Sequence, residues 1–356
     1  MTRLPISRAP RAPRANRATR PWRALAVATS VAVLLGGCAT SSLTPANPAP
    51  DAVTASPTPT EKPAYPLTID NCGTTVTVAK APSRIVSIKS SATELLLALG
   101  LGDHIVGTAF LDGPLPQALS SIGANLKVVS DFLPSQEAVL ALNPDFVFGG
   151  WESNFAADGV GTRDTLAAVG IGSYVSPSAC KGADQPNPLT FDTVFGEITQ
   201  AGAVFGAKEA AARLVATQRK ELTTLSPATT KTTALWYSSG VDSPYVGAGI
   251  GAPQMIMDAA GLTNVFASVK DTWTSVGWES VVAANPSVIV LVDATWNTAE
   301  AKIKTLEANP ATKNLTAVKN KRYITLPFAS TEAGIRNVEA AATTIDQLAA
   351  LNSLGK

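Results

Sequence analysis

Apolar and polar positions follow the same pattern at two places in the chain. Residues 137–148 read E-A-V-L-A-L-N-P-D-F-V-F, and residues 279–290 read E-S-V-V-A-A-N-P-S-V-I-V. Each copy predicts a helix of about two turns that stops at Asn-Pro, because proline disfavours helix at the preceding residue. The apolar run that follows is typical of a strand covered on both faces. Two matching units predict two similar lobes, each with a glutamate (Glu137, Glu279) in the first turn of its helix.

The rest of the folded part continues to alternate strand and helix patterns. This alternation predicts parallel sheets in both lobes. Between residues 191 and 225 only helical signals occur, and the second helix, over 207–225, would form a rigid connector about 27 Å long. The expected fold class is therefore α/β, with two parallel-sheet lobes joined by a long connecting helix. The predicted division is 1–38 as signal peptide, 39–66 as tether, 67–185 as the N-terminal lobe, 186–230 as connecting helices and 231–356 as the C-terminal lobe.

The first 38 residues have the composition of an export signal. Seven arginines fall within the first 23 residues, the run 24–35 is apolar but too short to span a bilayer comfortably, and Leu35-Gly36-Gly37-Cys38 looks like a bacterial lipobox. Cys38 is then the lipidation site, and the alternative is an ordinary signal peptide with an incidental cysteine. Residues 39–65, rich in Ala, Ser, Thr and Pro, predict a disordered tether. We expect the protein at the extracytoplasmic face of the bacterial cell membrane, held by a lipid anchor.

Charge and cysteine content both depend on that export signal. Without its seven arginines the chain has 21 basic and 27 acidic residues and no basic cluster, so we expect no nucleic-acid partner. With Cys38 lipidated, Cys72 and Cys180 remain in an oxidising compartment. We predict a disulfide between them, the alternative being two buried free thiols.

Residues suited to catalysis are scarce. His104 is the only histidine, no His/Cys cluster offers metal ligands, and neither a P-loop nor a G-x-S-x-G elbow occurs. The glycine-rich run 246–252 does not have the spacing of a dinucleotide-binding turn and is better interpreted as a ligand-facing loop. We expect a protein that is not an enzyme and that has neither a cofactor nor a metal site.

Aromatic residues, by contrast, fall where loops should follow the strands. Ligands of open parallel sheets bind beyond the carboxyl ends of the strands, so the cleft between the lobes is the expected site. Trp151, Trp273 and Trp296 have polar or glycine neighbours and would stack on a planar ligand, whereas Trp236 is assigned to the core. Arg163, Lys181 and Arg336 are candidate partners for an anion. The predicted ligand-binding residues are Ser90, Ser91, Phe110, Trp151, Glu152, Arg163, Ser238, Tyr245, Trp273, Trp296, Phe328 and Arg336.

The chain resembles substrate-binding lipoproteins of ABC transporters, in the class that carries ferric siderophores, haem and cobalamin. The resemblance spans about 68–351 and is clearest at Pro82-Ser83-Arg84-Ile85-Val86-Ser87, at Thr93-Glu94-Leu95-Leu96-Leu97-Ala98-Leu99-Gly100 and at the two Asn-Pro endings. It implies the helical-backbone fold of periplasmic binding proteins, a monomer, a small organic ligand, and a permease with its ATPase as partners. It also implies that Glu137 and Glu279 dock on permease arginines. A first-turn carboxylate that only favours the helix dipole is the alternative role.

A narrower resemblance concerns the ligand. The segments Gly150-Trp151-Glu152-Ser153-Asn154-Phe155, Trp236-Tyr237-Ser238-Ser239-Gly240, 246–257 and Asp293-Ala294-Thr295-Trp296-Asn297 are similar to an actinobacterial branch proposed to bind F-420-0, a precursor of the deazaflavin coenzyme F-420. That ligand is a flat aromatic ring with a phosphate ester and a carboxylate. A ferric-siderophore or corrinoid/haem receptor is the alternative within binding proteins. A cell-surface α/β enzyme and a purely structural lipoprotein are the alternatives outside that class.

Overall fold

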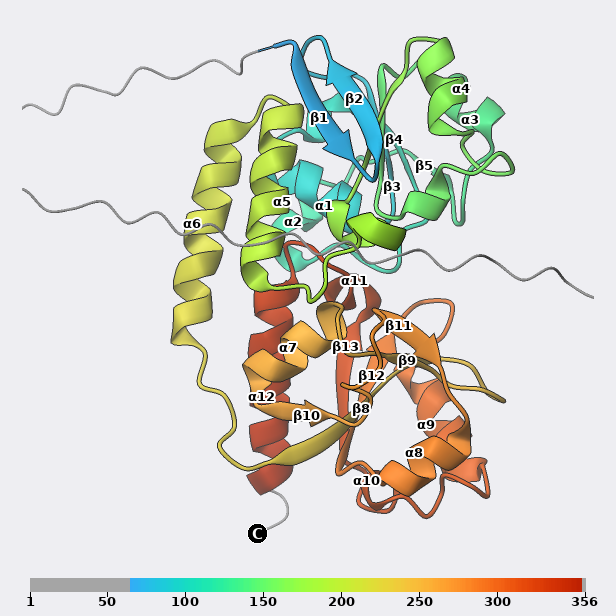
Figure 1. Ribbon diagram of the computed structural model, residues 1–356, viewed down its shortest axis with the longest axis vertical. Coiled ribbons are helices and arrows are strands. Elements are labelled where there is room, and N and C mark those ends of the chain that lie inside the picture. The colour runs from blue at the N-terminus through green and yellow to red at the C-terminus, as the bar shows by residue number, and fades with distance from the viewer. Residues whose placement is uncertain (1–64, 354–356) are drawn as a thin grey trace, which may run out of the picture. The chain divides into compact units, whose positions relative to one another are not determined.

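The computed structural model describes residues 65–353 (Figure 1). The predicted signal peptide, Cys38 and nearly all of the predicted tether lie outside these residues, so the lipid anchor stays a prediction. Within 65–353, no helix is long and apolar enough to cross a membrane.

The N-terminal lobe is a parallel sheet preceded by an antiparallel hairpin. The hairpin is β1–β2, and the sheet has the strand order β5-β4-β3-β6-β7 with every pair parallel. Its central strands are buried along their whole length, as a sheet covered on both faces requires. The elements are β1 Leu67–Asn71, β2 Thr74–Val78, β3 Ile85–Ile88, α1 Ser90–Ala98, β4 Ile105–Ala109, α2 Gln117–Ser120, β5 Val128–Ser130, α3 Gln136–Leu140, β6 Phe146–Gly149, α4 Arg163–Ala168 and β7 Gly172–Val175.

The C-terminal lobe holds a mixed sheet, in which β10, β8, β12 and β13 pair in parallel as predicted and β9 and β11 add an antiparallel edge that was not predicted. Its order is β11-β9-β8-β12-β13, with β10 also paired to β8, and β9 and β11 run antiparallel to their neighbours. The reason lies in the connection, because five residues join β8 to β9 and a parallel pair needs a crossover of about a dozen residues or more. The elements are β8 Thr232–Ser239, β9 Tyr245–Gly247, α7 Ala252–Ala260, β10 Leu262–Asn264, β11 Trp273–Ser275, α8 Trp278–Ala284, β12 Val288–Asp293, α9 Ala299–Ala308, α10 Thr316–Lys319, β13 Tyr323–Pro327 and α11 Phe328–Thr331.

Three helices accompany the passage from one lobe to the other. Helices α5 (Phe191–Val204) and α6 (Lys208–Thr224) lie side by side, and α12 (Asn337–Ser353) packs on α6 and α7 (Figure 1). A Cβ atom at Gly202 would approach the Ala211 side chain to 2.4 Å, so α5 and α6 approach each other closely at this glycine. One hydrophobic core cluster includes residues of both lobes and of α5 and α6, and Trp236 is fully buried in it, as predicted.

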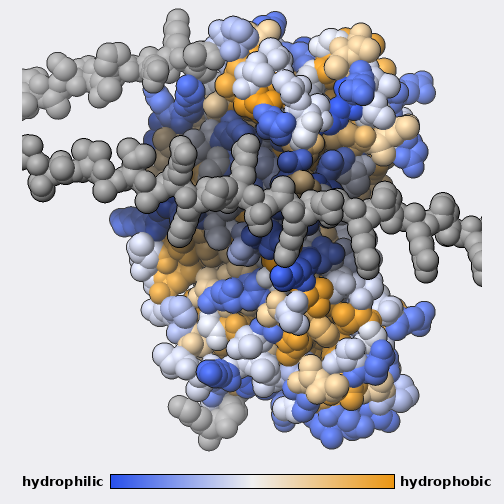
Figure 2. Space-filling model, in the orientation of Figure 1, coloured by the Kyte–Doolittle hydropathy of each residue, from blue (hydrophilic) through white to orange (hydrophobic). Residues whose placement is uncertain are grey.

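The repeated unit folds the same way twice. Helix α3 leads to β6 and helix α8 leads to β12, and in both copies the asparagine before the proline adopts a left-handed backbone, with φ 48° at Asn143 and 40° at Asn285. Ser135 caps α3 by accepting the Ala138 N–H, and Gly277 begins α8. Glu137 and Glu279 are both exposed. On the face shown in Figure 2, each lobe carries patches of hydrophobic residues among hydrophilic ones.

Candidate ligand-binding site

A cavity of about 740 Å³ is lined by residues of both lobes, as the sequence predicts. The size is that of a site for a small organic molecule. Part of its lining follows the carboxyl ends of parallel strands, with Trp151 beyond β6 and Phe328 immediately after β13, and part comes from β9 and β11. The lining residues are Phe110, Phe132, Gly150, Trp151, Glu152, Ser153, Ser176, Ser178, Ala179, Lys181, Pro186, Leu189, Ser238, Ser239, Tyr245, Gly251, Ala252, Thr272, Trp273, Trp296, Phe328, Thr331, Glu332 and Ala333.

Aromatic rings form two walls of the cavity. The N-terminal wall consists of Phe110, Phe132, Trp151 and the loop 176–181, and the C-terminal wall consists of Tyr245, Trp273, Trp296 and Phe328. Neighbouring rings meet along a line from Phe132 through Phe110, Trp151 and Phe328 to Trp296, with centroids 5.5–6.3 Å apart. Tyr245 stacks on Trp273 at 6.0 Å with an interplanar angle of 15°. Such surfaces suit a flat aromatic ligand.

A buried lysine lies under the N-terminal wall. Lys89 is 0% exposed, and its ammonium pairs with the Asp112 carboxylate. The same ammonium lies 3.8 Å from the ring centroid of Trp151, 4.1 Å from Phe110 and 4.8 Å from Phe328. Cation–π attraction therefore holds rings of both walls around one charge.

The backbone of Lys89 is strained, with φ 81° and ψ 151°, a region that glycine favours. It is held there because its N–H donates to the Ala109 carbonyl and its own carbonyl accepts from Thr93. Burial lowers the pKa of the Lys89 ammonium and raises the pKa of the Asp112 carboxyl, while their mutual attraction opposes both shifts.

Glu332 carries a carboxylate into the cavity from the C-terminal lobe. It follows α11, is half-buried, and accepts a hydrogen bond from the indole N–H of Trp151 at 2.7 Å. Burial raises the pKa of this carboxyl, and attraction to Lys89 and the Trp151 bond oppose the shift. This contact joins the N-terminal wall to the C-terminal lobe.

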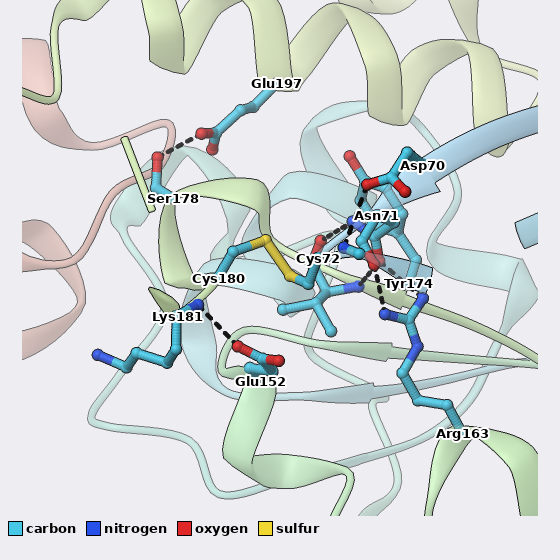
Figure 3. Close-up of a disulfide and its surroundings, with 12 residues drawn as sticks. Asp70, Asn71, Cys72, Glu152, Arg163, Tyr174, Ser178, Cys180, Lys181 and Glu197 are labelled. Carbon is cyan, nitrogen blue, oxygen red and sulfur yellow. Dashed lines mark hydrogen bonds between the residues drawn. A yellow bond between two sulfur atoms is a disulfide. The ribbon is translucent and has the colours of Figure 1, made fainter. Parts of the chain in front are cut away.

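The loop 176–181 is fastened to the N-terminal lobe at three points (Figure 3). Cys180 forms a disulfide with Cys72, as expected from the sequence. The Lys181 N–H donates to the Glu152 carboxylate at 2.7 Å, and the Ser178 hydroxyl donates to Glu197 of α5. Burial raises the pKa of Glu197 to about 7, although its bonds to Ser178 oppose the shift. Lys181, the cation among the described lining residues, therefore stands on an anchored loop.

Eight of the twelve predicted ligand-binding residues line the cavity. They are Phe110, Trp151, Glu152, Ser238, Tyr245, Trp273, Trp296 and Phe328.

The two serines predicted to bind ligand have another position. The Ser90 hydroxyl accepts the Asp112 N–H at 2.8 Å, and its own N–H faces the Asp112 carboxylate, so Ser90 supports the buried ion pair. Ser91 is the second residue of α1 and lines a separate space of about 20 Å³, room for about one water molecule. Both serines belong to the first turn of α1, which begins at Ser90, and neither lines the large cavity.

The two arginines also serve the fold rather than the cavity. Arg163 donates to the Asn71 carbonyl at 2.5 Å and to the Ser173 hydroxyl at 3.0 Å, which ties α4 to β1 and β7. Arg336 is nearly buried beside the buried Glu94 of α1, with 3.5 Å between their charged atoms. Burial raises the pKa of Glu94 to about 7, against the opposing attraction of Arg336. Their positive charges were the reason for choosing them, but each already faces an acceptor within the protein.

Sequence reasoning missed three charged residues around the cavity. Lys89 precedes a helix in an ordinary loop pattern, Asp112 lies in a Gly/Pro-rich loop, and Glu332 lies between helices α11 and α12. The available signal was weak, since only their place after strands β3, β4 and β13 would have marked them. Within the described residues there is no group of three or more His, Cys, Asp and Glu side chains placed to hold a metal ion.

Comparisons with known proteins give the class. A family model described as periplasmic binding protein matches residues 85–329. The chain is 28% identical over 332 residues to the uncharacterized ABC transporter substrate-binding lipoprotein YvrC of Bacillus subtilis (strain 168), across 89% of this chain and 93% of that protein. It is 26% identical over 221 residues to the vitamin B12-binding protein of Yersinia pestis (strain Pestoides F), across 60% of this chain and 70% of that protein.

Among solved structures, an ABC-type Fe3+-hydroxamate transport system from Saccharomonospora viridis DSM 43017 superposes with a TM-score of 0.69 and 26% identity, across 80% of this chain and 99% of that one. The chain belongs to the periplasmic binding protein family, as an ABC-type substrate-binding protein of the siderophore, haem and vitamin B12 class. These relatives are binding proteins of ABC transporters and not enzymes.

Proposed function

We propose that the protein captures F-420-0, the deazaflavin precursor of coenzyme F-420, between its two aromatic walls and hands it to an ABC permease. The observation that carries this proposal is the pair of walls themselves, which bring aromatic rings from both lobes to one cavity. Lys181 supplies a positive charge at the cavity for a phosphate ester or a carboxylate.

The alternative cargo is a ferric siderophore or a corrinoid or haem. It is favoured by relatives that are named for vitamin B12 and for Fe3+-hydroxamate transport. Aromatic walls suit an aromatic siderophore as well, so the ring system of the cargo must be tested directly.

Titration of the purified protein separates these ligands. F-420-0, a ferric hydroxamate and cobalamin are added in turn while tryptophan fluorescence is followed. Trp151, Trp273 and Trp296 line the cavity and Trp236 lies in the hydrophobic core, so a bound ligand should change the signal. We expect saturable quenching by F-420-0. A Trp273→Phe variant serves as the matched control, because it keeps a ring against Tyr245 and changes the signal more than the affinity. Saturation by cobalamin or the ferric hydroxamate, with no response to F-420-0, would overturn the proposed cargo.

Delivery is proposed to use Glu137 and Glu279, the exposed carboxylates of the repeated helices α3 and α8. In this proposal Cys38 carries the lipid, residues 39–66 form the tether, and the lobes occupy 67–185 and 231–356 around the connecting helices. Reversing both charges (Glu137→Lys with Glu279→Lys) should abolish uptake by cells and leave ligand binding unchanged. Glu209→Lys, an exposed change on α6, is the control. Loss of binding in the double variant would assign these glutamates another role.

A further inference from the structure

Glu332 has an acceptor oxygen that receives no hydrogen bond from the residues the structure describes. Its Oε2 accepts the Trp151 indole N–H, and no hydrogen bond from a described residue reaches Oε1. The carboxylate lines the cavity at the seam of the two walls, between Trp151 and the C-terminal lobe. A carboxylate in that position has capacity for one more donor.

The two lysines near Glu332 do not donate a hydrogen bond to its carboxylate. Lys89 attracts Glu332, but its ammonium is bonded to Asp112 and enclosed by three rings. Lys181 also attracts Glu332 from the anchored loop, without a bond between them. Glu332 lies beside aromatic rings, and one of its oxygens already accepts a hydrogen bond. Its other oxygen is therefore placed to accept a hydrogen bond from the edge of a bound ring.

We propose that Glu332 is a specificity-determining residue that accepts a hydrogen bond from an N–H at the edge of a planar ligand held between the walls. The inference rests on the proposed function, because it assumes a ring in this cavity. A deazaflavin meets the requirement, since its pyrimidinedione ring carries an imide N–H flanked by two carbonyl groups. Trp151, whose N–H already points to Glu332, positions the acceptor.

The test compares one ring with and without that donor. The probes are 8-hydroxy-5-deazariboflavin, which has the ring but neither phosphate nor carboxylate, and its N3-methyl derivative. For the wild-type protein we expect methylation to weaken binding about 10- to 100-fold, the loss typical of a hydrogen bond to a charged acceptor. In Glu332→Gln, affinity for the unmethylated ring should fall by about the same factor, and the two probes should bind almost equally.

The matched control is Glu209→Gln, which neutralises an exposed carboxylate of α6. Glu209 does not line the cavity, so the affinities for both probes and the ratio between them should stay at the wild-type values. Thermal melting of each variant shows whether it is folded. If Glu332→Gln does not fold, the comparison of the two probes on the wild-type protein and its pH profile decide the question.

The pH profile gives a readout that a purely structural role would not move. The ionised carboxylate is the acceptor, so affinity for the unmethylated ring should fall as the pH drops through the raised pKa of Glu332. The titratable groups that face Glu332 are Lys89, Asp112, Lys181 and Tyr245. In Glu332→Gln this decrease should disappear while the contributions of the other groups remain.

The outcomes are distinguishable. If the wild-type protein responds neither to the probes nor to F-420-0, the proposed cargo fails and the role of Glu332 fails with it. If F-420-0 binds but neither probe does, the charged groups carry the binding, and the role of Glu332 is overturned while the proposed cargo stands. If the wild-type protein binds both probes equally, or if the ratio persists in Glu332→Gln, the role of Glu332 is overturned while the proposed cargo stands.

Discussion

The two walls of the cavity are fastened to the protein in different ways. In the N-terminal wall, Trp151 and Phe110 cover a buried ion pair, and the loop 176–181 is held by a disulfide and two carboxylates. In the C-terminal wall, Tyr245 is 40% exposed and Trp296 is 45% exposed, and their ring neighbours are Trp273 and Phe328. Trp151 and Phe110 of the first wall, together with Phe328 of the second, pack against the buried core, whereas Tyr245 and Trp296 of the second wall and Phe132 at the end of the first are exposed.

Buried and exposed rings contribute to ligand binding in different ways. A preformed wall reduces the entropy that binding would otherwise lose in ordering side chains. A wall of exposed rings can adjust to the ligand without disturbing the core. Changes at the rings over Lys89, such as Trp151, should therefore lower both stability and affinity, whereas changes at the exposed rings Tyr245 and Trp296 should lower affinity alone.

The largest effect is expected from Lys89→Met. The methionine fills the space between the three rings but leaves Asp112 buried without its cation, which typically costs about 3–5 kcal/mol. Burial already raises the pKa of Asp112, so without Lys89 the carboxyl should protonate more readily. A group with a raised pKa in the folded state favours folding at low pH, so the loss of stability should shrink as the pH falls. Denaturant unfolding at several pH values measures it.

The control is the double variant Lys89→Met with Asp112→Asn, which removes both charges. It should recover much of the stability lost in the single variant, because no charge is left unpaired. Equal instability of the single and double variants at neutral pH would show that the ion pair does not hold the wall.

The sequence predicted the rings of both walls better than the ion pair behind them. Trp151, Trp273 and Trp296 could be found because large rings next to polar or glycine residues are unusual for a core. Lys89 could not be found, since its role depends on Asp112, 23 residues away, and on rings from three separate loops. Partners of that kind are brought together by the tertiary fold and leave no local pattern.

The same limit explains the misplaced arginines and the mixed sheet. Arg163 and Arg336 have the charge that an anion would need, but Asn71 and Glu94 lie far from them in sequence and occupy them first. The repeat at 137–148 and 279–290 predicted the fold class because helix, stop and buried strand are all local features. The antiparallel edge β9–β11 escaped notice because its strands are three residues long each.

A second, smaller effect is expected from Cys72→Ser with Cys180→Ser. The disulfide closes a loop between residues 108 positions apart, and its removal should destabilise the protein by about 2–4 kcal/mol. The loop 176–181 would keep its bonds to Glu152 and Glu197, so affinity should fall less than stability. Ser178→Ala is the matched control, since it releases the same loop from Glu197 with the disulfide intact. Unchanged unfolding midpoints in the double serine variant would contradict the view that this wall belongs to the core.

The smallest effect on stability is expected from Trp296→Ala in the C-terminal wall. The ring is nearly half exposed and meets Phe328 edge-on at 5.5 Å, so its loss should change the free energy of unfolding by no more than about 0.5 kcal/mol. Affinity for 8-hydroxy-5-deazariboflavin should still fall a few-fold to about tenfold, the worth of one aromatic contact. Trp151→Ala removes the same type of ring from the N-terminal wall, together with its bond to Glu332 and its cover over Lys89. Trp151→Ala should therefore lower both the free energy of unfolding and the affinity. If Trp296→Ala destabilises the protein as much as Trp151→Ala does, both walls are part of the folding core, and the lobes differ only in which residues build them.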